Sequence, residues 1–208
     1  MITGSPRNDV FFNHSQRLSN KDSDTLNTVK RVIYMPTLRG GIGSEFPCLI
    51  KSDFNYKEYD RMLERAGIYL EIKLHPVQVL SQIDSDQIKQ CRNIKLVQCA
   101  DIYEELPCFD ALITDYSSIM FDFMLTGKPI YMAPFDIDLY LAMDRSMYYE
   151  YSEICPSLIY KNWKQLFEDL VHNVYDFSKY REVTRRFHVY KDGYSSKRAF
   201  DAIQNILP

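Results

Sequence analysis

The chain has 208 residues, of which 46% are hydrophobic and 25% charged, and its formal net charge at pH 7 is −3. This composition is typical of a globular protein of one ordinary to large domain, and it disfavours a nucleic-acid binder that relies on bulk positive charge. No apolar run approaches the roughly 20 residues of a membrane span, and no secretory signal pattern opens the chain.

Strands and helices alternate through the first two thirds of the chain. Short apolar or alternating runs predict strands over Arg31–Met35, Ile68–Leu74, Ile94–Val97, Ala111–Thr114 and Ile130–Met132. Helices are predicted over Asn55–Ala66, Ile102–Leu106 (capped by Asp101) and Tyr116–Thr126, and residues 39–53 are predicted to be a long loop. Strands separated by helices favour right-handed β-α-β units, so the fold class is α/β, a Rossmann-like parallel sheet with flanking helices.

The last third of the chain is predicted to be helical. Apolar residues from Trp163 to Val174 form one amphipathic stripe, and a more basic helix is predicted over Asp176–Phe187, its charges best explained as a solvated face. Ser195 or Ser196 is expected to cap a final helix. We therefore divide the chain into residues 1–30, a lead-in with a first helix, residues 31–160, a Rossmann-like core, and residues 161–208, helices that pack on the same domain.

The segment Ile113-Thr-Asp-Tyr-Ser-Ser-Ile-Met-Phe-Asp122 is the most informative part of the sequence. It predicts a strand that leads into a helix, and the free N–H groups and dipole of a helix start suit a phosphate. It lacks the glycines of a Walker loop or a dinucleotide fingerprint. Two further polar clusters, Pro36–Arg39 and Lys73–Pro76, also follow strands. Because ligands of such sheets bind outside the carboxyl ends of the strands, the three clusters together predict a binding site.

Each polar residue at this edge has a plausible task. Ser117 and Ser118 are expected to accept a diphosphate, and Arg39 to hold phosphate oxygens in a bidentate fork. His75 is expected to donate a hydrogen bond to a phosphate or to protonate a leaving group. Asp122 lies four residues after Ser118, so it is expected to meet a ribose or polyol hydroxyl one turn below the phosphates.

Simpler structural explanations exist for the same residues. Taken alone, Ser117 is better explained as a helix N-cap, and Asp115 also fits the role of a cap. His75 alone is more often a surface or core histidine than a catalytic one. The five cysteines are scattered without Cys-x-x-Cys spacing, so reduced cytosolic thiols are expected and no metal site is predicted.

Seven short segments, spread over almost the whole chain, carry a family pattern. They are Thr3–Asp9, Tyr34–Arg39, Lys73–Pro76, Ile113–Asp122, Gly127–Ile130, Phe135–Tyr140 and Asp192–Ser196. In this order they resemble the CDP-glycerol glycerophosphotransferase family, the teichoic acid and capsule polymerases and primases. The resemblance implies a GT-B glycosyltransferase-like fold, with this chain as its C-terminal, nucleotide-binding half. It also implies transfer of glycerol phosphate from CDP-glycerol, or a related CDP-polyol, to a lipid-linked polymer, with release of CMP and no cofactor.

The resemblance also assigns roles to individual residues. His75, Ser117 and Ser118 would hold the donor diphosphate, and Thr37 and Arg39 would lie near the donor. From the same motif as the two serines, Asp115 is expected to border the substrate and Asp122 to lie near the donor hydroxyls. His75 is the catalytic candidate, with a role at the phosphates or the leaving group.

One family feature is absent from the sequence. Family members carry a Trp-His-Gly motif in an N-terminal domain, and its histidine is taken as the base that activates the acceptor, whereas the sole tryptophan here, Trp163, precedes Lys164. We therefore expect a missing N-terminal domain to supply acceptor contacts, and the chain alone to bind donor without appreciable turnover. The resemblance places the protein in the cytoplasm, peripherally at the inner face of the plasma membrane.

Two other functions remain open. The chain fits a non-catalytic module, or one part of a split enzyme, that docks on a partner carrying the other half. It also fits a GT-B domain that uses another nucleotide-activated sugar or polyol, because a two-serine turn accepts any nucleotide diphosphate. Glycerol and ribitol donors are both compatible with the pattern.

Overall fold

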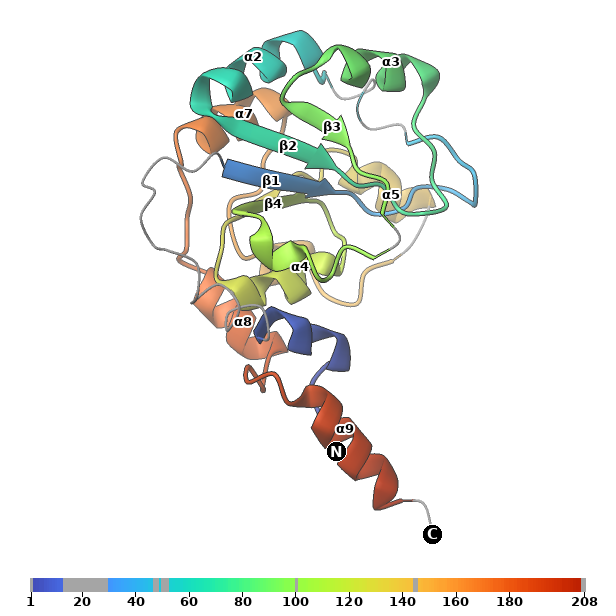
Figure 1. Ribbon diagram of the computed structural model, residues 1–208, viewed down its shortest axis with the longest axis vertical. Helices are drawn as coiled ribbons and strands as arrows, with labels where there is room; N and C mark the ends of the chain where they lie inside the picture. Colours follow the sequence, from blue (N-terminus) through green and yellow to red (C-terminus); the bar gives the residue numbers. More distant parts are fainter. Residues whose placement is uncertain are drawn as a thin grey trace.

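The computed structural model describes residues 2–12, 30–46, 49, 53–99, 101–143 and 146–206, and these form an α/β structure around one sheet (Figure 1). The sheet in the described ranges is five-stranded and parallel, in the order β3-β2-β1-β4-β5. The strands are β1 Lys30–Met35, β2 Ile68–Ile72, β3 Ile94–Leu96, β4 Ala111–Thr114 and β5 Ile130–Met132. All five predicted strands are confirmed, although β2 ends at Ile72 rather than Leu74. The strand order turns back at β1 and β4, so the crevice for a ligand is expected at their carboxyl ends.

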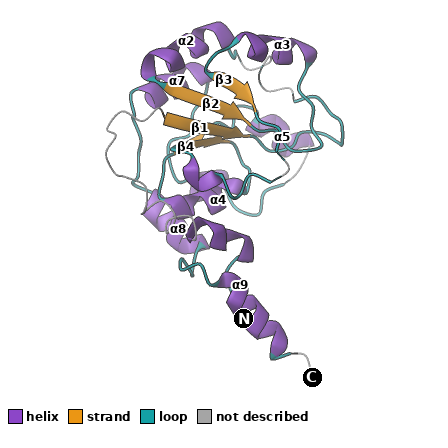
Figure 2. Ribbon diagram, in the orientation of Figure 1, coloured by secondary structure: helices purple, strands orange, loops and turns teal. Residues whose placement is uncertain are grey.

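Helices cover both faces of the sheet (Figure 2). The described helices are α2 Tyr56–Ala66, α3 Gln82–Gln90, α4 Ile119–Phe123, α5 Ile137–Met143, α6 Tyr151–Ile154, α7 Trp163–Val171, α8 Tyr180–Phe187 and α9 Ser195–Gln204. Short 3-10 helices are η1 Pro6–Asp9, η3 Leu106–Cys108 and η4 Met124–Thr126. One layer contains α2, α3 and α7, and the other contains α4, α6 and α8. None of the described helices is long and apolar enough to cross a lipid bilayer.

The alternation of side chains along β1 divides the core into two clusters. Val32 and Tyr34 face the layer of α2 and α7, whereas Ile33 faces the layer of α4 and α8. Trp163 is completely buried and meets Tyr34 edge-on, with ring centroids 5.1 Å apart. Such edge-to-face aromatic pairs add to the stabilisation from the area they bury. The core therefore fixes β1 from both sides and holds its carboxyl end in place.

The predicted helix α2 illustrates how local signals set an element. Tyr56, Tyr59 and Leu63 are buried at helical spacing. The side chain of Asn55 accepts a hydrogen bond from the Glu58 amide, which satisfies one of the free donors at the helix start. Gly67 ends the helix with φ of 64°, a left-handed conformation that glycine adopts at little cost.

Two predicted helices differ from the structure. The helix predicted over Ile102–Leu106 is wrong, because these residues form a turn followed by η3, and Pro107 inside η3 has no N–H to continue an α-helix. The helix predicted from Tyr116 begins only at Ile119 and becomes 3-10 from Met124 onward. Its apolar residues Ile119, Met120, Phe123 and Met124 are buried.

Several helices were not predicted, or were predicted with different bounds. In α3 the only buried apolar residue is Ile88, so the sequence carries little periodicity there. The short α5 and α6 were not predicted either. Helix α7 ends at Val171 rather than Val174, and α8 begins at Tyr180 rather than Asp176. The first helix expected before residue 30, and part of the loop expected over residues 39–53, fall outside the described residues.

The final helix is held at its start by a distant carboxylate. The predicted cap by Ser195 or Ser196 is wrong: Tyr194 is the N-cap residue, and the Asp9 carboxylate accepts from the amides of Ser195 (2.9 Å) and Ser196 (2.8 Å). This contact joins η1 to α9. Beyond it α9 projects from the body of the molecule, and Phe200 is exposed (Figure 1).

Candidate functional site

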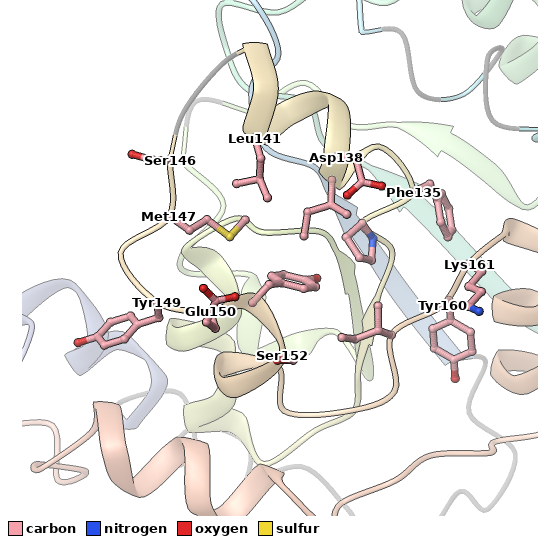
Figure 3. Close-up of a pocket in the computed structure, with 14 residues that line it drawn as sticks. Phe135, Asp138, Leu141, Ser146, Met147, Tyr149, Glu150, Ser152, Tyr160 and Lys161 are labelled. Atoms are coloured by element: carbon pink, nitrogen blue, oxygen red, sulfur yellow. The ribbon is translucent and has the colours of Figure 1, made fainter.

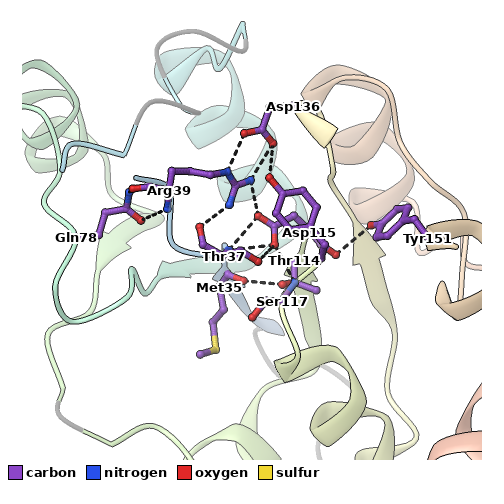
Figure 4. A network of polar contacts seen from close by, with 10 residues as sticks. Met35, Thr37, Arg39, Gln78, Thr114, Asp115, Ser117, Asp136 and Tyr151 are labelled. Atoms are coloured by element: carbon purple, nitrogen blue, oxygen red, sulfur yellow. Dashed lines mark hydrogen bonds and ion pairs between the residues drawn. The ribbon is translucent and has the colours of Figure 1, made fainter. Parts of the chain in front are cut away.

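The loops after β1 and β4 are joined by one buried carboxylate (Figure 4). The Thr37 amide donates to both oxygens of Asp115, each at 3.0 Å, and its hydroxyl donates to Oδ1 at 2.6 Å. Asp115 has no exposed surface. The side chain of Thr114, the last residue of β4, donates to the Met35 carbonyl at 2.6 Å. Asp115 therefore ties together the ends of the two strands that flank the crevice.

Arg39 turns its guanidinium toward two carboxylates of the protein (Figure 4). Nη2 donates to Asp115 Oδ2 at 2.7 Å, and a bidentate pair joins Nε and Nη2 to the two oxygens of Asp136, each at 2.8 Å. Nη1 also donates to the Thr37 carbonyl. Only 7% of the Arg39 side chain is exposed. We call Thr37, Arg39, Asp115 and Asp136 the anchor network; in it the fork predicted for phosphate is occupied by Asp136.

Two tyrosines extend the anchor network. Burial raises the pKa of the Tyr116 phenol, so the group stays protonated and donates to Asp136 Oδ1 at 3.0 Å. The Tyr116 ring also lies 4.5 Å from the Arg39 guanidinium, within cation–π range. Burial likewise raises the pKa of Tyr151, whose hydroxyl donates to the Asp115 carbonyl at 3.0 Å. Tyr116 was predicted to begin a helix; it instead precedes α4, and its hydroxyl and ring contact the anchor network.

The two serines keep their hydroxyl groups unengaged. The Ser117 amide donates to Asp115 Oδ1 at 3.1 Å, so that N–H is not available to a ligand. The alternative that Ser117 caps the helix is wrong, because Ser118 is the N-cap residue and makes no side-chain cap hydrogen bond. Neither serine hydroxyl has a hydrogen-bond partner within the described ranges, and Ser118 is exposed. The hydroxyls can thus serve an outside partner.

His75 lies beyond the end of β2, beside a cavity of about 530 Å³. The Val77 amide donates to His75 Nδ1 at 3.4 Å. In the neutral ring this contact places the proton on Nε2, which is then a donor on an exposed residue. Lys73 lines the same cavity, and only 7% of the residue is exposed. The sequence placed Lys73 in the polar cluster Lys73–Pro76 but assigned it no role of its own.

Asp122 lies apart from Asp115. Asp115 precedes helix α4, which begins at Ile119, whereas Asp122 lies within it. Asp122 is buried, and its Oδ2 pairs with Arg7 Nη2 at 2.8 Å and accepts from the Tyr103 hydroxyl at 2.8 Å. It lines a cavity of about 590 Å³ with residues of the N-terminal segment.

A third cavity, of about 740 Å³, opens beyond the end of β5 (Figure 3). Its wall combines the aromatic rings of Tyr149 and Tyr151 with the charged side chains of Asp138, Glu150 and Lys161. Tyr151 connects this cavity to the anchor network through its bond to the Asp115 carbonyl. Nowhere in the described part of the chain do three or more His, Cys, Asp or Glu side chains gather in an arrangement that could hold a metal ion.

Comparisons with known proteins agree with the fold and with the family pattern. The family model described as CDP-glycerol:poly(glycerophosphate) glycerophosphotransferase matches residues 1–205. The teichoic acid glycerol-phosphate primase of Bacillus subtilis (strain 168) is 29% identical over 210 residues, which cover 98% of this chain and 51% of that protein. The teichoic acid poly(ribitol-phosphate) polymerase of Bacillus spizizenii is 27% identical over 223 residues, covering 98% and 33%.

Among solved structures, the wall teichoic acid polymerase TagF superposes with a TM-score of 0.67 at 24% identity, over 97% of this chain and 50% of that one. This likeness and the parallel sheet confirm the predicted fold class. The chain spans about half, or less, of the length of the relatives named here.

Proposed function

The chain belongs to the CDP-glycerol:poly(glycerophosphate) glycerophosphotransferase family, and we propose that it forms the donor-binding part of such a transferase. The observation that carries this proposal is the set of groups at one edge of the sheet that no described residue engages, namely Nε2 of His75 and the hydroxyls of Ser117 and Ser118. They follow β2 and β4, which lie on either side of β1. Neighbouring strands are about 4.8 Å apart, so the ends of β2 and β4 are roughly 10 Å apart, a span that a nucleoside diphosphate bridges.

The donor in this proposal is CDP-glycerol or a related CDP-polyol. In the complete reaction an acceptor hydroxyl attacks the β-phosphorus, the new O–P bond forms, and the bond from the β-phosphorus to the CMP oxygen breaks. The hydroxyl proton passes to a base outside this chain, and CMP leaves with the bond's electron pair. His75 and the two serines hold the diphosphate in line and offset its charge, which is the main contribution a protein makes to such a transfer.

In this scheme the anchor network positions the loops around the donor and does not bind the donor itself. Its carboxylates accept hydrogen bonds from Thr37 and Arg39, so the network fixes the two loops between which the diphosphate lies. Asp122 keeps the predicted role near the donor hydroxyls. Both of its contacts use Oδ2, which leaves Oδ1 as an acceptor for a ribose or polyol hydroxyl.

The acceptor side of the reaction lies outside these residues in the proposal. A lipid-linked polymer would be bound, and its hydroxyl activated, by an N-terminal domain, as expected from the family pattern. The transferase would act peripherally at the inner face of the plasma membrane. The isolated chain is then expected to bind donor without sustained polymerisation.

Calorimetric titration tests the donor assignment. Wild-type chain is titrated with CDP-glycerol, CDP-ribitol and a UDP-sugar, and the titrations are repeated with His75→Ala and Ser117→Ala. We expect a CDP-polyol to bind more tightly than the UDP-sugar, and each substitution to weaken that binding about tenfold or more, the effect of losing a hydrogen bond to a charged group. His172→Ala and Ser178→Ala, which alter an exposed histidine and an exposed serine, serve as controls without effect.

Each other outcome contradicts a stated part of the proposal. Equal binding of the UDP-sugar would favour a sugar-nucleotide transferase domain instead. Absence of binding to all three nucleotides would contradict a donor site that forms within this chain.

A further inference from the structure

Lys73 is a largely buried residue whose side chain lines the cavity beside His75. It directly follows β2, and its backbone N–H donates to the Tyr34 carbonyl at 2.9 Å, which continues the pairing with β1 and fixes the start of the side chain. The residue is only 7% exposed. Its ammonium has no hydrogen bond or ion pair with any residue that the structure describes.

Two other cations among the described residues that are withdrawn from solvent are paired. Arg39 bonds to Asp115 and Asp136. Lys128 donates to the carbonyls of Pro107 (2.8 Å) and Phe109 (2.7 Å). Lys73 differs from both, because no described residue pairs with its ammonium and its side chain lines a cavity that an anion can enter.

The cavity beside Lys73 has the chemistry of an anion site. Its volume is about 530 Å³, and His75 stands on the same wall. The remaining polar lining comes from neutral side chains, those of Gln78, Ser85 and Gln98, and no described carboxylate lines it. An ammonium in a partly enclosed space without a competing carboxylate attracts phosphate oxygens strongly, because the surroundings screen its charge less than water does.

We propose that Lys73 binds the diphosphate of the donor beside His75, as the cation that offsets its charge. The proposal rests on the proposed function and extends it by one residue that sequence reasoning left unassigned. His75 supplies a directional hydrogen bond, and Lys73 supplies a point charge. The same ammonium would stabilise the negative charge that develops on the CMP phosphate as its bond to the β-phosphorus breaks.

Titration with inorganic pyrophosphate tests Lys73 apart from nucleotide recognition. The wild-type chain, Lys73→Met, Lys73→Arg and Lys95→Met are each titrated with pyrophosphate, CDP-glycerol and cytidine. Lys95 is an exposed lysine on the neighbouring strand β3 and does not line the cavity, so it is the matched control. We expect Lys73→Met to weaken pyrophosphate and CDP-glycerol at least tenfold, Lys73→Arg to retain more affinity than Lys73→Met, and Lys95→Met to bind as wild type. Cytidine carries no phosphate, so its binding should not respond to any of the substitutions.

The outcomes separate this inference from the proposed function. If wild type and Lys73→Met bind CDP-glycerol equally, the role of Lys73 is overturned while donor binding stands. If pyrophosphate binding depends on Lys73 but CDP-glycerol is not preferred over a UDP-sugar, Lys73 stands and the proposed donor does not. If wild type binds neither pyrophosphate nor CDP-glycerol, both are overturned.

A measurement on the unmodified chain removes any dependence on the folding of variants. Reductive methylation of wild type is followed by mass spectrometry of the peptide that contains Lys73, with and without saturating pyrophosphate. We expect pyrophosphate to slow methylation of Lys73 and to leave Lys95 unchanged. Equal rates at Lys73 in the two samples would overturn the inference.

Discussion

Two groups of charged residues lie at the same edge of the sheet and differ in how their charges are neutralised. In the anchor network, Arg39 is enclosed by Asp115 and Asp136, and the charges satisfy one another. On the other side of β1, Lys73 lines a cavity and has no partner among the described residues, and no described residue contacts Nε2 of His75 beside it. The difference supports the proposal that paired charges at this edge maintain the loops, whereas the ammonium that no described residue pairs binds an anionic ligand.

The largest effect is expected from breaking the anchor network. Arg39→Met leaves two carboxylates, one of them completely buried, without their cation. Removing one partner of a buried pair is expected to lower the free energy of unfolding by about 3–5 kcal/mol. Urea unfolding measures this, with Arg65→Met, an exposed arginine at the end of α2, as the control. A loss below about 1 kcal/mol would show that the network behaves as a surface ion pair and does not hold the loops.

A smaller effect is expected at the carboxylate that caps α9, which tests whether paired carboxylates outside the edge also act as anchors. Burial alone would raise the pKa of Asp9, but the Ser196 and Ser195 amides outweigh it and hold the pKa below its usual range. The folded-state pKa is then below the unfolded value, so the stabilisation is present above about pH 4 and is lost as the pH falls through the folded-state pKa.

Asp9→Ala tests this linkage. At pH 7 the substitution is expected to lower the free energy of unfolding by about 1 kcal/mol, the typical contribution of a cap. At pH 2 the difference between wild type and the variant should shrink. Asp201→Asn, in an exposed ion pair with Lys197, is the control and should show little effect at either pH. A difference of equal size at the two pH values would contradict the role of the Asp9 charge.

The strands could be predicted from the sequence because they are short apolar or alternating runs, and their parallel orientation was expected from the helices between them. The position of three polar clusters at one edge also followed from those strands. The sequence did not reveal which charged side chains pair with one another. Asp136 lies 97 positions from Arg39 along the chain, and no local pattern indicates that it would occupy the fork predicted for phosphate.

The position of Asp122 relative to Asp115 depends on the residue at which helix α4 begins, and local sequence signals do not define that residue. Helix α4 starts at Ile119, after the two serines, so Asp115 is not part of it. The later start follows from Asp115 itself, which accepts from the Ser117 amide and holds the serine turn outside the helix. Lys73 was visible in the sequence, but only the structure shows that no described residue pairs with its ammonium.

The most direct test of the central contrast is urea unfolding of Lys73→Met with and without pyrophosphate. Without ligand we expect the variant to be about as stable as wild type, because a methionine of similar length keeps the packing of the side-chain stem and no described residue pairs with the ammonium that it replaces. Pyrophosphate at 100 times its Kd should stabilise wild type by about 2.7 kcal/mol and the variant much less. A variant that loses stability without ligand, or that gains as much as wild type from the same pyrophosphate concentration, would contradict the account.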